Sequence, residues 1–361
     1  MSSLPLLKIG QHVARYPIIQ GGMGIRISGA NLAAAVANAG GIGIISAVGL
    51  GFRSPYFDAE KKKGNLFAAN RLALIDELQL ARALSPDGVM GINCMMAARD
   101  HETLIRTAVE YGANLIIGGA GLPLNLPEYT QSNPNVALVP IVSTVRAARL
   151  ICRSWQRHYH RLPDAFVVET PNAAGGHLGA RSEELGNPAL DLARVIPELI
   201  NYLRDELGAM IPVIAAGGIW DRQDIDQMLA LGASGVQMGT RFITTHECDA
   251  DIRYKKFHLH ASPDDVVVLP SPVGLPGRAL RNAFAEQVLH QPETLDKRCI
   301  ANCLRVCRCR DAREEFCILQ ALDRAASGDV ENGLIFAGSH AGRATEIVSV
   351  ADLMAELVAD S

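Results

Sequence analysis

The chain has 361 residues, of which 48% are hydrophobic and 20% are charged, and its formal net charge is −4. This is ordinary soluble composition, with enough residues for one barrel-sized core or two average domains. Because the sequence has neither a basic stripe nor an apolar run of about 18 residues, we expect no nucleic acid and no membrane as partner. We also see no signal peptide pattern and expect a cytoplasmic protein.

Eight short apolar runs alternate along the chain with stretches that have a helical pattern. The runs are apolar throughout, which is typical of strands buried on both faces of a parallel sheet. They span residues 17–23, 41–47, 89–95, 114–121, 137–143, 165–170, 211–218 and 235–242. Eight strand–helix repeats predict an α/β fold of the (β/α)8 TIM barrel type, and a doubly wound open sheet is the alternative.

Two connections are longer than a barrel requires. Residues 48–88 predict a lid-like insertion within a barrel core that spans residues 1–243. Residues 244–361 predict a C-terminal extension that packs on the barrel and carries a cysteine-rich segment. The extension ends with a predicted helix at "SVADLMAELVAD", and its irregular first part is expected to fold back over the barrel mouth.

Glycines lie at the ends of several predicted strands, where a barrel of this type carries its functional groups. Gly217 and Gly218 end the seventh run, and Gly239 and Thr240 lie in the eighth. Their backbone N–H groups can approach a phosphate, and Asp221 is a candidate N-cap for the helix that follows. This pattern predicts a phosphate site, with tight strand-to-helix turns as the alternative explanation.

A histidine directly follows a pair of glycines in "ETPNAAGGHLGA", residues 169–180, just past the sixth run. Gly175 and Gly176 lose much conformational freedom on folding, which suggests that the backbone must pass close to something. Imidazole titrates near neutral pH and suits acid–base chemistry. We therefore predict His177 as a catalytic residue at the barrel mouth, with an incidental histidine in a turn as the alternative.

Five of the eight cysteines lie in "CIANCLRVCRCRDAREEFC", residues 299–317. Their spacing matches neither the paired cysteines of zinc ribbons nor the usual iron–sulfur runs. We predict no metal site and name Cys303, Cys307, Cys309 and Cys317 as the candidate ligands if the segment holds one. Small core thiols, an iron–sulfur or zinc site, and redox-active thiols all stay open.

Four motifs, "PIIQGGMG", "AAGGHLG", "IPVIAAGGI" and "GVQMGTRF", carry a family resemblance in their order and spacing. They resemble the nitronate monooxygenases, also called 2-nitropropane dioxygenases, and the related FMN-dependent enoyl-ACP reductases. The resemblance covers roughly residues 15–345, and "SPVGLPGRALRN" and "GDVENGLIFAGSHAGR" are similar to longer bacterial members. It implies a barrel that binds FMN and oxidises alkyl nitronates with O2 through reduced flavin, with His177 as the acid–base residue.

The resemblance also implies the cofactor contacts. The flavin ring is expected against the end of the first strand, and the phosphate against the ends of the seventh and eighth. The predicted cofactor-binding residues are Gly21, Gly22, Met23, Asn93, Thr170, Gly175, Gly176, Ala216, Gly217, Gly218, Gln237, Met238, Gly239 and Thr240. In such an enzyme the protein orients the cofactor and handles protons.

The chain departs from the family pattern at two places. Ala173 stands where many members have a glutamate, and Ile141 or Val142 stands where some nitronate enzymes have a lysine near the flavin. A missing cation makes a negatively charged reduced flavin harder to stabilise. One alternative is therefore an NAD(P)H-dependent flavin reductase of an enoyl thioester or quinone.

A nucleotide- or sugar-phosphate-binding barrel without flavin is the alternative from another class. Such barrels have a similar arrangement of glycines, but those that act as dehydrogenases need a cysteine nucleophile on a mobile loop. Cys94 and Cys152 lie in a predicted strand end and a predicted helix. Every one of these functions implies a small-molecule substrate, and a homo-oligomer stays open.

Overall fold

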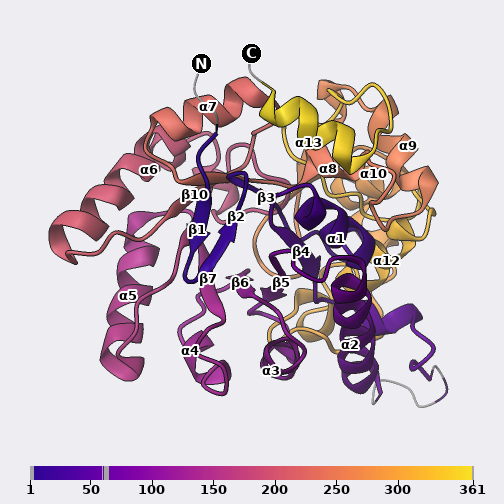
Figure 1. Ribbon diagram of the computed structural model, residues 1–361. Coiled ribbons are helices and arrows are strands. Elements are labelled where there is room, and N and C mark those ends of the chain that lie inside the picture. Colours follow the sequence, from indigo (N-terminus) through magenta and orange to yellow (C-terminus); the bar gives the residue numbers. More distant parts are fainter. Residues whose placement is uncertain (1–3, 59, 61–64, 360–361) are drawn as a thin grey trace.

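The computed structural model describes residues 4–58, 60 and 65–359, and its centre is an eight-stranded parallel sheet (Figure 1). The strand order is β3-β11-β10-β8-β7-β6-β5-β4. The Gln20 N–H donates to the Ile42 carbonyl at 2.9 Å, and the Ile42 N–H donates to the Ile18 carbonyl at 2.9 Å. These bonds join the two outer strands of that order, so the predicted (β/α)8 barrel is confirmed.

The eight barrel strands fall within the eight apolar runs. They are β3 (Ile18–Gln20), β4 (Gly43–Ser46), β5 (Met90–Met95), β6 (Leu115–Gly119), β7 (Ala137–Val142), β8 (Phe166–Glu169), β10 (Val213–Ala216) and β11 (Gly235–Met238). Alternate side chains such as Ile44, Ile117 and Val167 fill the barrel interior, and their neighbours face the outer helices. Burial on both faces explains why these runs are apolar throughout.

Helices surround the barrel (Figure 1). In chain order they are α1 (Ala30–Asn38), α2 (Leu66–Leu84), α3 (His101–Glu110), α4 (Leu126–Tyr129), α5 (Val145–Tyr159), α6 (Leu192–Asn201), α7 (Arg222–Ala230) and α8 (Thr240–Ile243). The last helix, α13 (Val350–Val358), was expected from the sequence and packs against α1 and α7. Within the described ranges, no helix is long and apolar enough to cross a membrane.

The predicted lid-like insertion contains one of these outer helices. α2 accounts for residues 66–84 and packs against α1 and α3, which is the ordinary place of a barrel crossover helix. A short 3-10 turn, η1 (Leu50–Arg53), precedes it. Residues 59 and 61–64 lie outside the described part of the chain. A lid stays a prediction for the residues that precede α2.

A hairpin of β1 (Leu7–Ile9) and β2 (His12–Ala14) lies across the end of the barrel at which its strands begin (Figure 1). Leu7, Ile9 and Ala14 are buried together with the barrel interior, so the hairpin closes that end. Because the hairpin closes this end, the opposite end of the barrel is the one left for a site.

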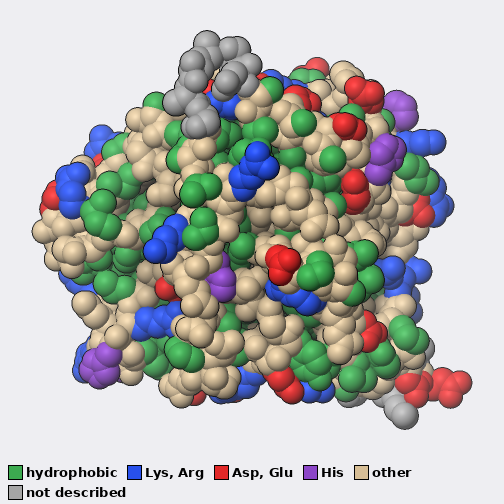
Figure 2. Space-filling view, in the orientation of Figure 1, with side chains coloured by type: hydrophobic (Ala, Val, Ile, Leu, Met, Phe, Trp, Pro, Cys, Tyr) green, Lys and Arg blue, Asp and Glu red, His purple; other side chains and the backbone are tan. Residues whose placement is uncertain are grey.

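Figure 2 shows charged side chains of both signs scattered over the face seen in Figure 1.

The C-terminal extension contains α9 (Ile252–His260), β12 (Val266–Leu269), β13 (Gly277–Leu280), α10 (Ala283–His290), α11 (Arg308–Asp311) and α12 (Ile318–Ala326). Its strands β12 and β13 form a three-stranded antiparallel sheet with β9 (Gly176–His177). Because β9 lies in the loop after β8, the extension is joined by backbone hydrogen bonds to the loop that carries His177.

Candidate active site at the mouth of the barrel

A cavity of about 230 Å³ lies at the carboxyl ends of the barrel strands. The strand ends each contribute to its wall, through Gly21, Ser46, Asn93, Gly119, Ile141, Glu169, Gly217 and Gly239. The extension contributes Tyr254, Leu322, Phe336, Ala337, Gly338, Ser339 and His340. A concave site at this end of a barrel is where substrates and cofactors are normally bound.

The structure brings His177 and all but one of the predicted cofactor-binding residues to this cavity. The exception is Thr170, whose hydroxyl accepts the Asn172 N–H at 3.3 Å. Its methyl group lies 3.0 Å from the position that a Cβ on Gly217 would take. Thr170 therefore shapes the turn after β8 and is not among the residues that line the cavity, and its contact with the cofactor stays a prediction.

Glycines at the mouth are required by the local backbone. A Cβ on Gly175 would lie 2.5 Å from the carbonyl carbon of Ala337, so only glycine fits there. Gly217 and Gly218 have φ angles of +97° and +75°, which favour glycine. Asp221 caps α7 as expected by accepting the Asp224 N–H at 3.0 Å. The tight turns that were the alternative explanation are thus present, and the same glycines line the cavity.

His177 is held in place by the C-terminal extension. Its backbone pairs with Gly277 of β13, and its Nε2 lies 2.9 Å from the hydroxyl of Ser271. The ring meets Phe336 edge-on, with centroids 5.0 Å apart. Burial lowers the pKa of His177 to about 4. The imidazole is therefore neutral at neutral pH and can accept a proton.

A buried arginine of β13 anchors the loop that precedes His177. The Arg278 guanidinium donates to the carbonyl oxygens of Ala174 and Pro171, the latter at 3.0 Å. Burial lowers the pKa of Arg278. Because both acceptors lie just before β9, this side chain fixes the approach of the loop to the cavity.

Glu169 is a titratable side chain of the cavity to which the sequence analysis gave no role. It ends β8, and within the described chain its carboxyl group has no hydrogen bond or ion pair. Burial raises its pKa to about 7. A carboxylate at the end of an otherwise apolar strand was the signal that could have identified it. No lysine or arginine is among the described residues that line the cavity, and Ile141 stands at the end of β7.

Two polar groups without partners suit a phosphate-bearing cofactor at this site. Among the described residues, Nδ1 of His340 and Oε1 of Gln237 are buried and make no hydrogen bond. The Gly338 N–H donates to the Thr240 hydroxyl at 2.9 Å, which brings residues 338–340 beside the glycine turns after β10 and β11. The His340 ring can donate to a phosphate oxygen, whereas Gln237 Oε1 can only accept, as from an N–H of a flavin ring. The residues present therefore fit a flavin nucleotide. The sequence analysis missed this contribution of residues 336–340.

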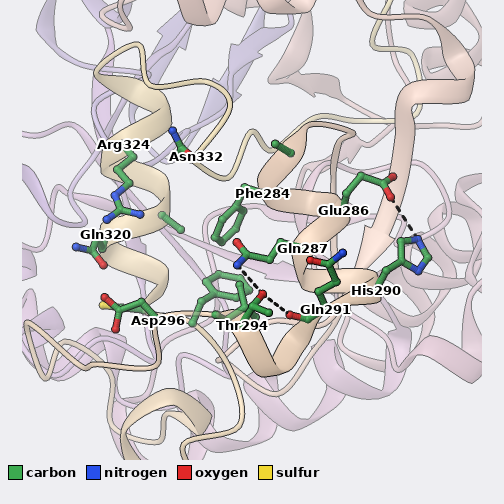
Figure 3. A pocket seen from close by; sticks show the side chains of 15 residues that line it. Phe284, Glu286, Gln287, His290, Gln291, Thr294, Asp296, Gln320, Arg324 and Asn332 are labelled. Carbon is green, nitrogen blue, oxygen red and sulfur yellow. Dashed lines mark hydrogen bonds and ion pairs between the residues drawn. The ribbon is translucent and has the colours of Figure 1, made fainter.

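A second cavity, of about 570 Å³, lies on the extension, between α10 and α12 (Figure 3). It is bordered by polar side chains, and the Gln287 amide donates to the Thr294 hydroxyl at 2.7 Å. It shares no lining residue with the mouth cavity. We place the site at the mouth, where titratable groups and backbone donors converge.

Comparison with known proteins decides the family. The profile of the family described as nitronate monooxygenase matches residues 6–360. The chain belongs to the nitronate monooxygenase family. This family member is 28% identical over 292 residues to a probable nitronate monooxygenase of Staphylococcus haemolyticus, with 75% of this chain and 77% of that protein covered.

Another relative carries the name (3aS,4S,5R,7aS)-5-hydroxy-7a-methyl-1-oxo-octahydro-1H-indene-4-carboxyl-CoA dehydrogenase and comes from Mycobacterium tuberculosis. It is 28% identical over 281 residues, which cover 76% of this chain but 65% of that protein. The solved structure of FabK from Thermotoga maritima is 27% identical, with a TM-score of 0.70 and coverage of 95% and 92%. A nitroalkane oxidase from Streptomyces ansochromogenes, 19% identical with a TM-score of 0.68 and coverage of 96% and 95%, shares the fold.

Family membership makes this protein an enzyme, a flavin-dependent oxidoreductase of the nitronate monooxygenase kind. The glycine turns and the two partnerless polar groups at the mouth are the features of this chain that suit such a cofactor.

Proposed function

We propose that this member of the nitronate monooxygenase family binds FMN and oxidises alkyl nitronates with O2, with His177 as its acid–base group. One observation carries the proposal: a single cavity joins the turn at Gly217 and Gly218 to a half-buried, neutral His177. When bound, the flavin supplies the electron transfer between substrate and O2.

The cofactor phosphate would be held by the extension and the last two barrel strands together. Gly218, Gly239 and His340 all line the cavity, and Cε1 of His340 lies 4.0 Å from the position that a Cβ on Gly218 would take. Backbone N–H groups at such turns bind phosphate oxygens without a charged side chain. This matches a cavity to which the described chain contributes no lysine or arginine.

His177 would exchange a proton with the substrate. Its ring is neutral because burial lowers its pKa to about 4, so it can accept a proton at neutral pH. The contact of Nε2 with Ser271 and the edge-on contact with Phe336 fix the ring plane. Fixing the ring favours proton transfer because less conformational entropy is lost when the transition state is reached.

Reduction of an enoyl thioester or quinone by NAD(P)H is the second candidate. A negatively charged nitronate finds no lysine or arginine in the described wall of the cavity, which favours a neutral substrate. The name of the mycobacterial relative also contains a coenzyme A thioester. This candidate uses the same cavity and the same His177.

An anaerobic absorbance titration of the purified holoenzyme separates the two functions. We expect the flavin bands to persist with NADH and NADPH and to bleach when propyl-2-nitronate is added. Rapid bleaching by either nicotinamide would support the reductase instead. Protein that neither retains FMN nor rebinds it would overturn both functions and favour a flavin-free phosphate-binding barrel.

A further inference from the structure

Glu169 lies in the wall of the mouth cavity, and the proposed reaction gives it no task. It ends β8, is half-buried, and makes no hydrogen bond or ion pair within the described chain. The other titratable side chains among the described residues of that wall are His177, Tyr254 and His340. The Tyr254 hydroxyl donates to the Phe336 carbonyl at 3.4 Å, and both histidines already have proposed roles. Glu169 is therefore the titratable group of this wall that is left for a ligand.

The register of the sheet turns the Glu169 side chain toward the barrel interior. Glu169 lies beside Ala216 of β10, and Ala216 lies beside Gln237 of β11. Val167, two residues before Glu169, is buried in the barrel interior, and side chains two residues apart on a strand share a face. Glu169, Ala216 and Gln237 all line the cavity. The carboxyl group therefore faces the space in which a substrate is bound.

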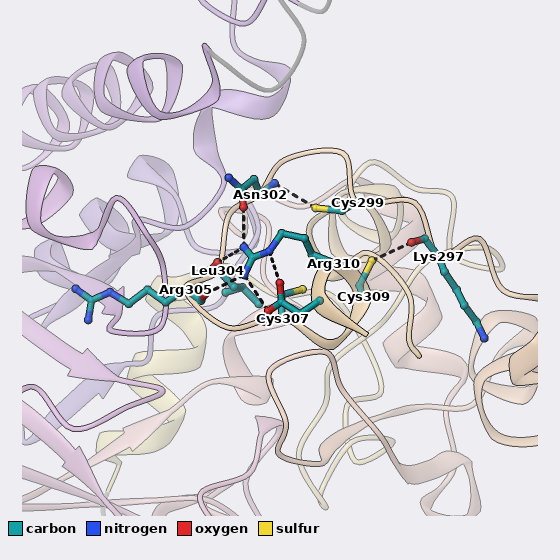
Figure 4. A network of polar contacts seen from close by, with 9 residues as sticks. Lys297, Cys299, Asn302, Leu304, Arg305, Cys307, Cys309 and Arg310 are labelled. Atoms are coloured by element: carbon teal, nitrogen blue, oxygen red, sulfur yellow. Dashed lines mark hydrogen bonds and ion pairs between the residues drawn. The ribbon is translucent and has the colours of Figure 1, made fainter. Parts of the chain in front are cut away.

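Arginines near the mouth are occupied elsewhere. The Arg278 guanidinium donates to backbone carbonyls of the loop before His177. In the segment that pairs with the loop after β5, the Arg310 guanidinium donates to the Asn302 side chain and to the Leu304 carbonyl, both at 2.6 Å (Figure 4). Neither arginine is among the residues that line the cavity. A charged substrate oxygen must be hydrogen-bonded when it leaves water, so the described wall has to supply neutral donors.

A protonated carboxyl group is such a donor, because its O–H can donate a hydrogen bond. We propose that Glu169, in its protonated form, donates a hydrogen bond to an oxygen atom of the substrate. This role rests on the mouth being the substrate site of the proposed function. The proton stays on Glu169, and His177 keeps the proposed proton exchange. Carboxylic acids that an apolar site keeps neutral serve other enzymes as donors to oxyanions.

Substrates of both candidate functions present an oxygen to this donor. A nitronate carries its negative charge on two oxygens, and the carbonyl oxygen of an enoyl thioester or quinone gains negative charge on reduction. Burial raises the pKa of Glu169 to about 7, so the donor is present at lower pH. Ionised Glu169 has no proton to donate and repels negative charge. The affinity of the mouth for an oxyanion should therefore fall as pH rises above about 7.

Calorimetric titration of the purified holoenzyme with isobutyrate tests the proposal. Isobutyrate has the shape and charge of propyl-2-nitronate and lacks its nitro group, so it binds without reacting. We expect the dissociation constant to be steady near pH 6 and to rise about tenfold for each pH unit above about 7. Neutral isobutyramide should show little change, because its amide can accept from the protonated carboxyl group and donate to the ionised one.

Substitutions of Glu169 separate the hydrogen bond from the titration. In Glu169→Gln the amide can donate at every pH, so isobutyrate should bind about as tightly at pH 8 as at pH 6. Glu169→Ala removes the donor and should weaken binding at pH 6 by about tenfold or more. Glu110→Gln, which changes an exposed carboxyl group of α3, is the matched control and should behave as wild type.

Three outcomes would overturn the proposal. One is wild-type protein that does not bind isobutyrate at pH 6 or binds it equally at every pH. Another is the wild-type pH dependence in Glu169→Gln, which would assign the titration to another wall group such as His340. The third is Glu169→Ala protein that loses flavin but keeps its affinity for isobutyrate, which would make Glu169 a flavin contact.

Failure of the proposal stays distinguishable from failure of nitronate oxidation. Calorimetry requires no turnover, and the flavin content of each protein is measured in parallel. If Glu169→Ala does not fold, the pH profiles of wild type and Glu169→Gln still decide.

Discussion

The two sides of the mouth are built in different ways. The barrel side presents glycines and backbone N–H groups at positions that the parallel strands fix, such as Gly217 and Gly239. The extension side supplies side chains that hold the loop carrying His177, Ser271 on His177 and Arg278 on the residues before it. The barrel thus supplies the glycine turns of the proposed cofactor site, to which the extension adds His340, and the extension also positions the group proposed to exchange protons.

The mouth also holds two titratable groups whose pKa values burial shifts in opposite directions. His177 has a folded pKa of about 4, below its ordinary 6.5, so its contribution to stability is lost as pH falls from 6.5 towards 4. Glu169 has a folded pKa of about 7, above its ordinary 4.5, so its contribution is lost as pH rises from 4.5 towards 7. Between pH 4.5 and 6.5 the two effects oppose each other.

The largest effect is expected from removing the proton-exchanging group itself. His177→Ala should lower turnover by ~10²-fold or more while the flavin stays bound, because the proposed phosphate contacts are other residues, Gly218, Gly239 and His340. Steady-state kinetics and the flavin absorbance of the purified variant measure this. His158→Ala, which removes an exposed histidine of α5, is the control. Unchanged turnover in His177→Ala would remove the assigned role.

Glu169→Gln should reveal the cost of placing a half-buried carboxyl group at the mouth. The pKa of Glu169 is about 7 in the folded protein and about 4.5 ordinarily. This difference corresponds to a loss of roughly 3 kcal/mol at most in the free energy of unfolding at high pH. The flavin-free variant should therefore be more stable than wild type at pH 8 by up to that amount and equal to it near pH 4. Urea unfolding across this pH range measures the difference. Equal pH profiles for wild type, Glu169→Gln and the exposed control Glu110→Gln would contradict the shift.

Gly175→Ala tests the contact between the two sides. The new Cβ would overlap the Ala337 backbone, so we expect a loss of about 2 kcal/mol or more in unfolding free energy, together with weaker flavin binding. Gly186→Ala meets no atom within 4 Å but has a φ of +81°, so it should cost about 1 kcal/mol and leave flavin binding unchanged. A Gly175→Ala variant as stable as Gly186→Ala would show that the contact is dispensable.

The smallest effect is expected from the hydrogen bond between the two sides. Ser271→Ala removes a partner of His177 worth about 1 kcal/mol, which corresponds to a loss of about fivefold in turnover. In a chain that already carries His177→Ala, the same substitution should change nothing further, because its effect acts through that ring. A double-mutant cycle on kcat measures this, and additive losses would rule out the positioning role.

Patterns along the chain were sufficient to predict the barrel. A strand buried on both faces is apolar throughout, and eight such runs with helical stretches between them leave few other arrangements. The glycines at strand ends and His177 after β8 were predictable for the same reason, since the carboxyl ends of parallel strands meet at one mouth. Local sequence did not show that the Thr170 side chain packs beside Gly217 in the turn after β8.

Contacts distant in sequence were decided only by the tertiary structure. Phe336 and His340 come to the mouth because β13 pairs with β9 and Gly338 bonds to Thr240, over separations that no periodic pattern encodes. The same holds for the neutral state of His177 and the raised pKa of Glu169, since both follow from burial. The amino-acid sequence by itself determined the barrel and the place of its mouth, because strand and helix periodicity are local properties. The C-terminal extension's place over that mouth, and with it the environment of the reactive groups, depended on packing between segments far apart in the chain.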